Sequence, residues 1–560
     1  MSLINTHTRT RAQESTGAIE RLYITMRHLF NRGFYKPMGV SGETLREALL
    51  ILRPEIYGSI AEDKIELQGL LYVMDRLPKG IEECRFINLT SDEGYANSHF
   101  EPIIPAKRRR NCYRIDEEQM NIEITRGRSE IYDILTHLTF LYVESHKIMK
   151  QVLIDEDGTV IRDWKKLEVA VQKKDTLTQE EKEIALTHTA NFLGRTFEEV
   201  SRVFPLFGNK ENPNRFFNII YYLGKLAIQE AKGEEKRIIT FSPVLRERLG
   251  HHIHGERWAT HIKKKMAEKQ LLQRPIHIIS ANMHSVMNSL FAETALPTEA
   301  KKFKRLQLFE MLSDAKHLKL RDKVVKKASQ NGMLFIPDSS GTNIDVQVFD
   351  SDMFPEHICA NEGKTIEDKP VLVVMDYAFG EQAYETMDEL LKPFTDAQGH
   401  QHFLNVVSVS IMGKAGILEG GKGDVMIPSA HVFEGTADNY PFKNRLKKSH
   451  FEDDDINVCT GSMITVLGTS LQNRDVLKFF HESTWNVIGL EMEGAHYQKA
   501  IQAAAKIRGS ISSNVKVRYA YYASDNPLET GSTLASGGLG TSGVKPTYAI
   551  TEKMLKQILE

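Results

Sequence analysis

The stretch Val487-Ile-Gly-Leu-Glu-Met-Glu-Gly-Ala-His496 decides the fold. Its apolar beginning predicts a buried strand, and the residues from Glu491 onward predict the start of a helix. A second stretch, Val517-Arg-Tyr-Ala-Tyr-Tyr-Ala-Ser-Asp-Asn-Pro527, also runs from an apolar segment into polar residues, and Pro527 favours an extended residue before it. Polar residues that follow buried strands lie at the carboxyl edge of an α/β sheet, where such folds bind ligands.

The same alternation of apolar runs and helical periodicity extends over the second half of the chain. Strand-like runs occur at residues 276–280, 333–336, 346–349, 371–375, 406–412, 424–428, 462–467, 487–489 and 515–523. Such alternation predicts an α/β domain with a central, largely parallel sheet that is covered by helices.

The residues before about 236 follow a different pattern. Apolar side chains recur three and four residues apart over residues 19–31, 42–52, 60–77, 129–152 and 215–231. Strand signals are sparse in this part of the chain. We therefore expect two domains: residues 1–235, which are mainly helical and serve regulation or oligomerisation, and residues 236–560, which form the α/β domain.

Composition and charge narrow the class of partner. The chain has 560 residues, a formal net charge of -2 and a pI near 6.9, so no global field attracts nucleic acid or an anionic membrane. Its longest apolar runs are far shorter than the ~20 residues of a membrane span. Four scattered cysteines without metal-ligand spacing indicate a reducing compartment, and we expect a cytoplasmic protein.

Two basic segments are assigned no ligand. Lys107-Arg-Arg-Arg110 is short and is followed closely by acidic residues, so it is interpreted as a solvated loop. Gly250-His-His-Ile-His-Gly255 has no carboxylate or cysteine at a suitable spacing, so it is not interpreted as a metal site.

Two acidic residues suit the cleavage of a purine N-glycosidic bond. That reaction makes the ribose cationic and drives electrons into the base, so a protonated carboxyl at the base and a carboxylate at the sugar both help. Desolvation by Tyr521 and Tyr522 would raise the pKa of Asp525 and keep it protonated. Glu493 suits bidentate binding of two ribose hydroxyls, and Met492 would cover the sugar. The alternatives are an Asx-turn at the aspartate and a helix start whose acids complement its dipole.

A third element, residues 408–428, reads as strand, glycine-rich loop and strand, which lets backbone amides approach a ligand. It contains the motifs Gly413-Lys-Ala-Gly416 and Gly423-Asp-Val425. Together with Met492-Glu-Gly494 and Ser524-Asp525, these motifs follow the order found in the nucleoside phosphorylase/nucleosidase superfamily, which the chain resembles from residue 276 to the C-terminus. Within that superfamily the chain looks most like bacterial AMP nucleosidase, on the run Ser524-Asp-Asn-Pro-Leu-Glu-Thr-Gly531.

The resemblance implies a three-layer αβα phosphorylase/hydrolase fold, a purine ribonucleoside or nucleotide as the small-molecule partner, assembly into dimers or hexamers, and no metal or organic cofactor. It implies Asp525 as the acid at the purine, Glu493 on the ribose hydroxyls and Met492 on the sugar. The further residues expected to bind substrate are Gly413, Lys414, Ala415, Gly416, Glu491, Ser524, Asn526, Asn282 and Ser280. Lys414 would pair with a substrate phosphate, or it is a solvated loop lysine. Residues 376–384 look like the second glycine-containing strand-to-helix turn of these enzymes.

One departure concerns activation of the nucleophile. Related nucleosidases carry a glutamate after the first strand, and phosphorylases carry a basic residue in the corresponding turn, whereas this chain reads Asn282-Met-His-Ser285. His284 is either the substitute or a capping and packing residue. The expected reaction is hydrolysis of a purine nucleotide, AMP by preference, to free base and ribose 5-phosphate. Two alternatives stay open: phosphorolysis with phosphate as second substrate, and a nucleotide-binding sensor without catalysis.

Overall fold

The computed structural model describes residues 10–155, 158–173, 177–359, 365, 367–436, 438–529 and 540–560. These residues fold into two compact units. The first unit comprises the described residues of Met1–Ile124, Glu130–His251 and Ser470–Val476, and the second comprises those of Thr125–Ser129, His252–Thr469 and Leu477–Glu560. The boundary that we predict near residue 236 stays a prediction.

The first unit is mainly helical, as predicted. Its helices are α1 (Arg11–Arg32), α2 (Val40–Leu52), α3 (Leu67–Met74), α4 (Gly127–Val152), α5 (Arg162–Lys173), α6 (Gln179–Leu193), α7 (Phe197–Phe207), α8 (Arg215–Ala231) and α9 (Pro243–Gly250). Helix α8 has the bounds that the apolar periodicity predicts. No helix in the described part of the chain combines the length and apolar character that crossing a membrane requires.

The first unit also contains a sheet that the sequence patterns do not predict. Its described strands, in spatial order, are β1 (Phe34–Tyr35), β5 (Ile238–Phe241), β2 (Phe86–Thr90), β4 (Gln119–Glu123) and β3 (Cys112–Arg114). The inner pairs are parallel and the two outer pairs are antiparallel. Each strand has at most five residues, so none offers a long enough run for a period of two to stand out.

The helix predicted over residues 60–77 is confirmed only from Leu67 to Met74. Its beginning is set by the Glu66 carboxylate, which accepts the backbone N–H groups of Gln68 and Gly69 at 3.1 and 3.3 Å. A side chain that satisfies these amides stabilises a helix start at that point. The residues before it therefore form a turn rather than a longer helix.

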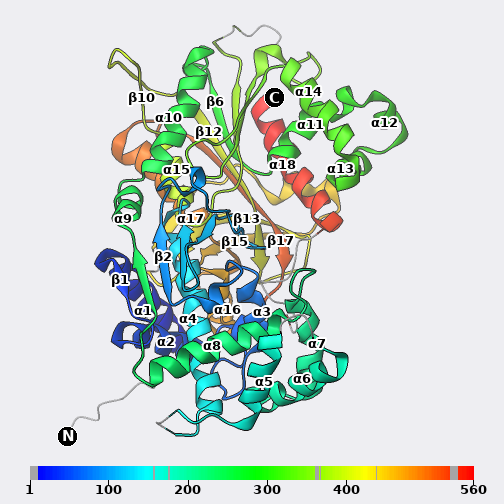
Figure 1. The fold of residues 1–560 in the computed structure, drawn as a ribbon. Helices are drawn as coiled ribbons and strands as arrows, with labels where there is room; N and C mark the ends of the chain where they lie inside the picture. The colour runs from blue at the N-terminus through cyan, green and yellow to red at the C-terminus, as the bar shows by residue number, and fades with distance from the viewer. Residues whose placement is uncertain are drawn as a thin grey trace, which may run out of the picture. The chain divides into compact units, whose positions relative to one another are not determined.

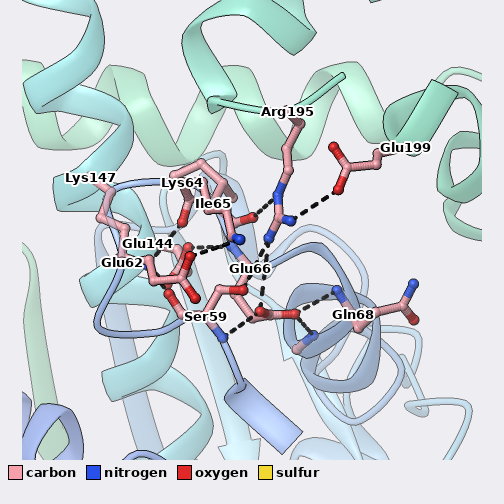
Figure 2. A network of polar contacts seen from close by, with 11 residues as sticks. Ser59, Glu62, Lys64, Ile65, Glu66, Gln68, Glu144, Lys147, Arg195 and Glu199 are labelled. Atoms are coloured by element: carbon pink, nitrogen blue, oxygen red, sulfur yellow. Dashed lines mark hydrogen bonds and ion pairs between the residues drawn. The ribbon is translucent and has the colours of Figure 1, made fainter. Parts of the chain in front are cut away.

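Figure 2 shows the polar network that holds this turn in the first unit. The backbone N–H of Glu66 donates to the Glu144 carboxylate at 2.9 Å, and Lys147 lies 2.8 Å from the same carboxylate. Lys147 also donates to the carbonyl oxygens of Ser59 and Lys64, both at 3.2 Å. The α4 side chains thus replace water as partners for the backbone of a buried turn.

Replacing Glu144 by glutamine is expected to remove a pH dependence of local stability in this unit. Burial raises the pKa of Glu144 from 4.5 to about 7, while Lys147 and the Glu66 amide act against the rise. The folded chain therefore binds an additional proton, so the stability contributed by this carboxyl falls as pH rises from about 4.5 to about 7. Between these limits wild type should lose roughly 1–3 kcal/mol that Glu144→Gln does not lose.

Amide hydrogen exchange of α3 and α4 at about pH 5 and about pH 8, corrected for intrinsic rates, measures the effect as a free energy of opening. Glu62→Gln is the matched control, because the Glu62 side chain is 53% exposed and pairs with Lys64 at the edge of the same network. An equal pH dependence in wild type and Glu144→Gln would contradict the assignment.

The interpretation of residues 107–110 as a solvated loop is wrong for two of its arginines. Arg108 makes two hydrogen bonds to the Asp133 carboxylate, at 3.0 and 2.9 Å. The Arg110 side chain is 1% exposed and lies 2.8 Å from Asp133 and 3.3 Å from Glu130. Carboxylates on α4 neutralise these arginines, so they are not displayed to a phosphate backbone.

The second unit is built on a mixed sheet. Its strands are β6 (Ile276–Ser280), β7 (Met333–Ile336), β8 (Val346–Asp350), β9 (Val371–Met375), β12 (Val406–Ile417), β13 (Val425–Phe433), β14 (Asn439–Pro441), β15 (Val458–Thr465), β16 (Val487–Glu491) and β17 (Lys516–Asp525), with a separate hairpin of β10 (Phe394–Thr395) and β11 (Gln401–His402). Strands β9, β6, β12 and β17 are parallel neighbours, as are β13, β15 and β16. The predicted parallel arrangement holds within these groups, while β7, β8 and β14 join antiparallel at the edges.

Helices cover both faces of this sheet (Figure 1). One core forms where α10 (Ile253–Glu268), α15 (Gln382–Leu390) and α17 (Gly494–Gln502) pack on the sheet. The other forms under α11 (Met283–Ala295), α13 (Arg305–Ser313), α14 (Leu318–Gln330) and α18 (Val544–Leu559). Two further helices are α12 (Pro297–Lys302) and α16 (Arg474–Glu482). The predicted three-layer αβα class is confirmed.

Candidate active site

The predicted order of strand, glycine-rich loop and strand over residues 408–428 is present as β12, a turn that contains Gly420, Gly421 and Gly423, and β13. The motif Gly413-Lys-Ala-Gly416 lies within β12, so our placement of this motif in the loop is wrong. Gly413 pairs with Tyr521 of β17, and a Cβ atom on Gly413 would lie 3.0 Å from the Tyr521 ring. The strand continues because its glycines admit the neighbouring aromatic ring, not because they turn the chain. The register shifts between Ala415 and Gly416, which marks a local irregularity at this point.

Gly416 brings the two acidic motifs together. On one side it pairs with Asp525, the last residue of β17, and on the other with Leu490, which precedes the last residue of β16. Adjacent strands are spaced by about 5 Å, so the backbones of these two strand ends lie roughly 10 Å apart. The two motifs therefore meet across one strand.

Asp525 is a buried carboxyl with one oxygen unused. Its side chain is 7% exposed, Ser524 donates to Oδ1, and Oδ2 has no hydrogen-bond partner among the described residues. Burial raises the pKa of Asp525, as predicted, while the Ser524 hydrogen bond and the charge of Lys414 act against the rise. A raised pKa keeps a carboxyl available as a proton donor.

The neighbours of Asp525 hold the strand end in place. The Ser524 hydroxyl also lies 3.1 Å from the Ala415 carbonyl oxygen, and the Asn526 amide donates to the Gly420 carbonyl at 3.0 Å. Asn526 also accepts the backbone N–H of Leu528 at 3.0 Å, which is an Asx-turn. Ser524 and Asn526 therefore position Asp525, and Thr530 and Gly531 of the same motif lie outside the described residues.

Glu491 has its oxygens occupied by the start of α17. It is 4% exposed, Thr465 donates to Oε1, and the backbone N–H groups of Glu493 and Gly494 donate to Oε2. Burial raises the pKa of Glu491 to about 7, and these hydrogen bonds oppose the rise. The carboxyl satisfies amides of a helix start, so we propose a positioning role for it in place of the predicted substrate contact.

Glu493 projects from the same turn and accepts backbone hydrogen bonds. The Gly380 backbone N–H donates to its Oε1 at 2.9 Å. Burial raises the pKa of Glu493 to about 8, the charge of Glu491 adds to the rise, and the Gly380 amide opposes it. Met492 approaches the same turn, because a Cβ on Gly380 would lie 3.9 Å from its Cε. The facing turn at Gly380 and Glu381 is held by Ser129, whose hydroxyl oxygen accepts the backbone N–H of Glu381 at 2.8 Å.

Gly494→Ala is expected to destabilise the second unit. A Cβ at Gly494 would lie 2.6 Å from the Tyr521 hydroxyl oxygen and would also overlap the His431 ring. His431 Nε2 and the Tyr521 hydroxyl form a buried hydrogen bond of 3.0 Å, so neither side chain has room to withdraw. Overpacking of this kind typically costs about 1–3 kcal/mol, which thermal unfolding would show as a lower Tm. Gly421→Ala is the control, because its Cβ would meet no atom within 4 Å, and equal Tm values for the two variants would contradict the expectation.

Of the two predicted site residues at the end of β6, Ser280 is buried and Asn282 is exposed. Ser280 is 1% exposed, and its hydroxyl lies 3.0 Å from that of Tyr497. Asn282 is exposed and caps α11 by accepting the backbone N–H of His284 at 3.0 Å. Ser280 is thus engaged in the core, and substrate binding by the exposed Asn282 stays a prediction.

A cavity of about 440 Å³ opens beside these residues. Its lining includes Asn282, His284, Lys414 and Tyr522, which come from the carboxyl-terminal ends of β6, β12 and β17. Neither Asp525 nor Glu493 is among its lining residues. The structure therefore brings the two acids to neighbouring strand ends, and the cavity lies on the side where the exposed Lys414 emerges.

His254, in the segment of residues 250–255, serves the fold. His254 is 2% exposed, and its Nδ1 lies 2.8 Å from the Ser340 carbonyl oxygen. In the described part of the chain, no group of three or more His, Cys, Asp or Glu side chains is arranged to hold a metal ion.

Three residues without an assigned role in the sequence motifs reach this region in the structure: Gly380, Ser129 and Arg321. The resemblance of residues 376–384 to a glycine-containing turn was a usable signal for Gly380. Ser129 and Arg321 carry no such signal, because each reaches the region only through the fold.

The sequence profile of one protein family matches residues 43–307 and 292–560, and its description is "Family of unknown function (DUF6909)". No curated protein matches the sequence.

Three solved structures illustrate the structural likeness. Campylobacter jejuni 5'-methylthioadenosine/S-adenosyl homocysteine nucleosidase is 12% identical, with 50% of this chain and 97% of that chain covered and a TM-score of 0.30. A futalosine hydrolase mutant of Helicobacter pylori is 13% identical, with 51% and 99% covered and a TM-score of 0.32. Arabidopsis thaliana 5'-methylthioadenosine nucleosidase is 10% identical, with 51% and 96% covered and a TM-score of 0.30. Because these TM-scores are low, we draw the function from the geometry of this chain.

Proposed function

This chain belongs to the family of unknown function DUF6909, and we propose that it is an N-ribosyl hydrolase that cleaves a purine nucleotide or nucleoside, with AMP preferred. The products are the free base and ribose 5-phosphate, or ribose. We propose a cytoplasmic homo-oligomer, dimer or hexamer, that needs no metal or organic cofactor. The mainly helical first unit would then serve regulation or oligomerisation.

The observation that carries the proposal is the buried Asp525 carboxyl at the end of β17. It has an unpartnered oxygen among the described residues, burial raises its pKa, and Gly416 of β12 pairs with it on one side and with Leu490 of β16 on the other. A buried carboxyl with a raised pKa and an available oxygen suits a general acid for a leaving purine. The neighbouring Glu493 supplies the second carboxyl that the reaction requires.

The proposed reaction divides between the two acids. Asp525 donates its proton to the purine as the bond between the base nitrogen and the anomeric carbon breaks, and the base leaves with the bonding electrons. Glu493, held by the Gly380 amide, binds the ribose hydroxyls near the developing positive charge. Water adds to the anomeric carbon and loses a proton.

His284 is the candidate acceptor for the proton of that water. Burial lowers the pKa of His284, the charge of Arg321 adds to the lowering, and Asp376 opposes it. The imidazole is therefore neutral near pH 7 and able to take up a proton. It lines the cavity together with Asn282, at the position where related nucleosidases carry their glutamate.

The direct test is to incubate the full chain with AMP, adenosine or inosine, with and without phosphate, and to measure the free base and the sugar product. Release of adenine from AMP without phosphate, with ribose 5-phosphate as the second product, supports the hydrolase. Strict dependence on phosphate would replace it with phosphorolysis, the second candidate, which the basic side chains of the cavity favour. Binding of AMP without release of any base would leave only a sensor.

A further inference from the structure

The charged side chains that line the cavity beside β6, β12 and β17 are basic. Its charged members are Arg321 and Lys414, the neutral imidazole of His284 lies beside them, and none of its described lining residues carries a carboxylate. The uncharged members include several hydroxyl groups: Ser285, Ser313, Tyr522, Thr547 and Tyr548. Cationic groups and hydroxyl donors around one hollow complement an anion with several oxygen atoms.

Arg321 is the strongest cation of this cavity, and it comes from α14. Its Nε donates to the Leu312 carbonyl at 2.5 Å, which fixes the guanidinium between α13 and α14. No carboxylate pairs with it in the described part of the chain. An arginine with its fork held at one end and its charge uncompensated is suited to bind a planar or tetrahedral oxyanion.

The other two basic residues approach from different elements. His284 is the second residue of α11, and Lys414 emerges from β12 beside Tyr522 of β17. Asp376 opposes the lowering of the His284 pKa from outside the cavity lining. In Figure 1, α11, α13, α14 and α18 gather on one side of the sheet, and His284 and Arg321 belong to α11 and α14.

Asn288 provides an independent sign of a missing partner. It is 4% exposed and lines the cavity, and its Nδ2 donates to the Tyr548 hydroxyl at 2.8 Å, which leaves Oδ1 without a partner among the described residues. If the amide is turned by half a rotation, the Tyr548 hydroxyl donates to Oδ1 and Nδ2 becomes a donor for a ligand. A buried amide with one unsatisfied end costs free energy unless a ligand completes it.

We propose that this cavity binds a phosphoryl group and that Arg321 is the residue that selects substrates carrying one. This inference rests on the proposed function, for which it names the substrate class. The phosphoryl group is either the 5′-phosphate of a nucleotide or free inorganic phosphate. Both sources present the same tetrahedral oxyanion to Arg321 and Lys414.

Equilibrium binding of AMP, adenosine and inorganic phosphate to the full chain tests the proposal, in an Asp525→Asn background so that turnover does not disturb the measurement. Arg321→Gln is expected to weaken AMP binding roughly 10- to 100-fold and to leave adenosine binding within about 2-fold. Arg321→Lys keeps the positive charge but loses the forked guanidinium, so its affinity for AMP should lie between those of the parent and Arg321→Gln. Lys323→Gln, exposed on the same helix, is the matched control and should behave as the parent.

The outcomes distinguish the 5′-phosphate of a nucleotide from inorganic phosphate as the ligand. They also distinguish a failure of the phosphoryl site from a failure of the proposed hydrolase function. Loss of AMP affinity with adenosine unchanged assigns the cavity to the 5′-phosphate. Loss of inorganic phosphate affinity, with AMP and adenosine bound equally, assigns it to free phosphate. Unchanged affinity for both AMP and phosphate in a variant with parental Tm overturns the phosphoryl site. Because binding is measured separately from turnover, the role of Arg321 in binding a phosphoryl group can be tested even if the chain releases no base.

Discussion

Asp525→Asn is expected to lower kcat for base release by roughly 10² to 10⁴-fold, the usual contribution of a general acid. Asparagine keeps the size of the side chain and can still accept the Ser524 hydrogen bond. It has no proton of suitable acidity to give to the purine. The loss should therefore appear in kcat, measured as adenine release from AMP, with the Tm close to that of wild type.

Asp424→Asn is the matched control for this experiment. Asp424 lies in the adjacent turn, where its Oδ2 accepts the Gly421 backbone N–H at 2.8 Å and the Asn457 amide at 2.9 Å. Its loss of charge affects a structural turn, so kcat should change little. If Asp525→Asn retained most of the wild-type activity, Asp525 would not be the acid.

Glu493→Gln is expected to lower kcat/KM by roughly 10²-fold. The glutamine oxygen can still accept the Gly380 N–H, so the turn should keep its shape. Glutamine cannot ionise, so the stronger hold that a carboxylate would give on the ribose hydroxyls as positive charge develops on the ring is lost. Steady-state rates of base release, measured with the Tm of the same preparation, check the expectation.

Glu491→Gln separates a catalytic effect from a structural one at the same turn. The Glu491 carboxyl accepts one hydroxyl and two backbone N–H groups at the start of α17, so its replacement should lower the Tm. If Glu493→Gln likewise changed only stability, its carboxylate would be a helix-start residue and not a sugar ligand.

The carboxyl ends of β16 and β17 are features that could be predicted from the sequence. The apolar runs before Glu491 and Asp525 predicted buried strands, and both acids are the last residues of β16 and β17. The apolar run at residues 371–375 corresponds to β9 without change. These predictions hold because a buried strand must be continuously apolar, and that requirement is visible in adjacent residues.

The glycines of β12 show where such prediction fails. Glycines typically mark a loop, yet Gly413 and Gly416 stay in the ladder because Tyr521 and Asp525 of a distant segment pair with them. Arg110 in the first unit is a similar case. Its basic neighbours in the sequence predicted a solvent-exposed side chain, whereas in the structure it is buried and forms ion pairs with Glu130 and Asp133 of α4. Local composition carries no information about such partners.

By itself, the sequence determined the α/β class of the second unit, the helical character of the first, and the order of the motifs that carry the two acids. Only the tertiary structure decided that Gly416 separates those acids, that the Gly380 amide holds Glu493, and that Arg321 reaches a cavity at the end of β6. The reason is physical: strand and helix periodicity is written in neighbouring residues, whereas a pKa, an unpartnered oxygen or a cavity depends on side chains that meet only after the chain has folded.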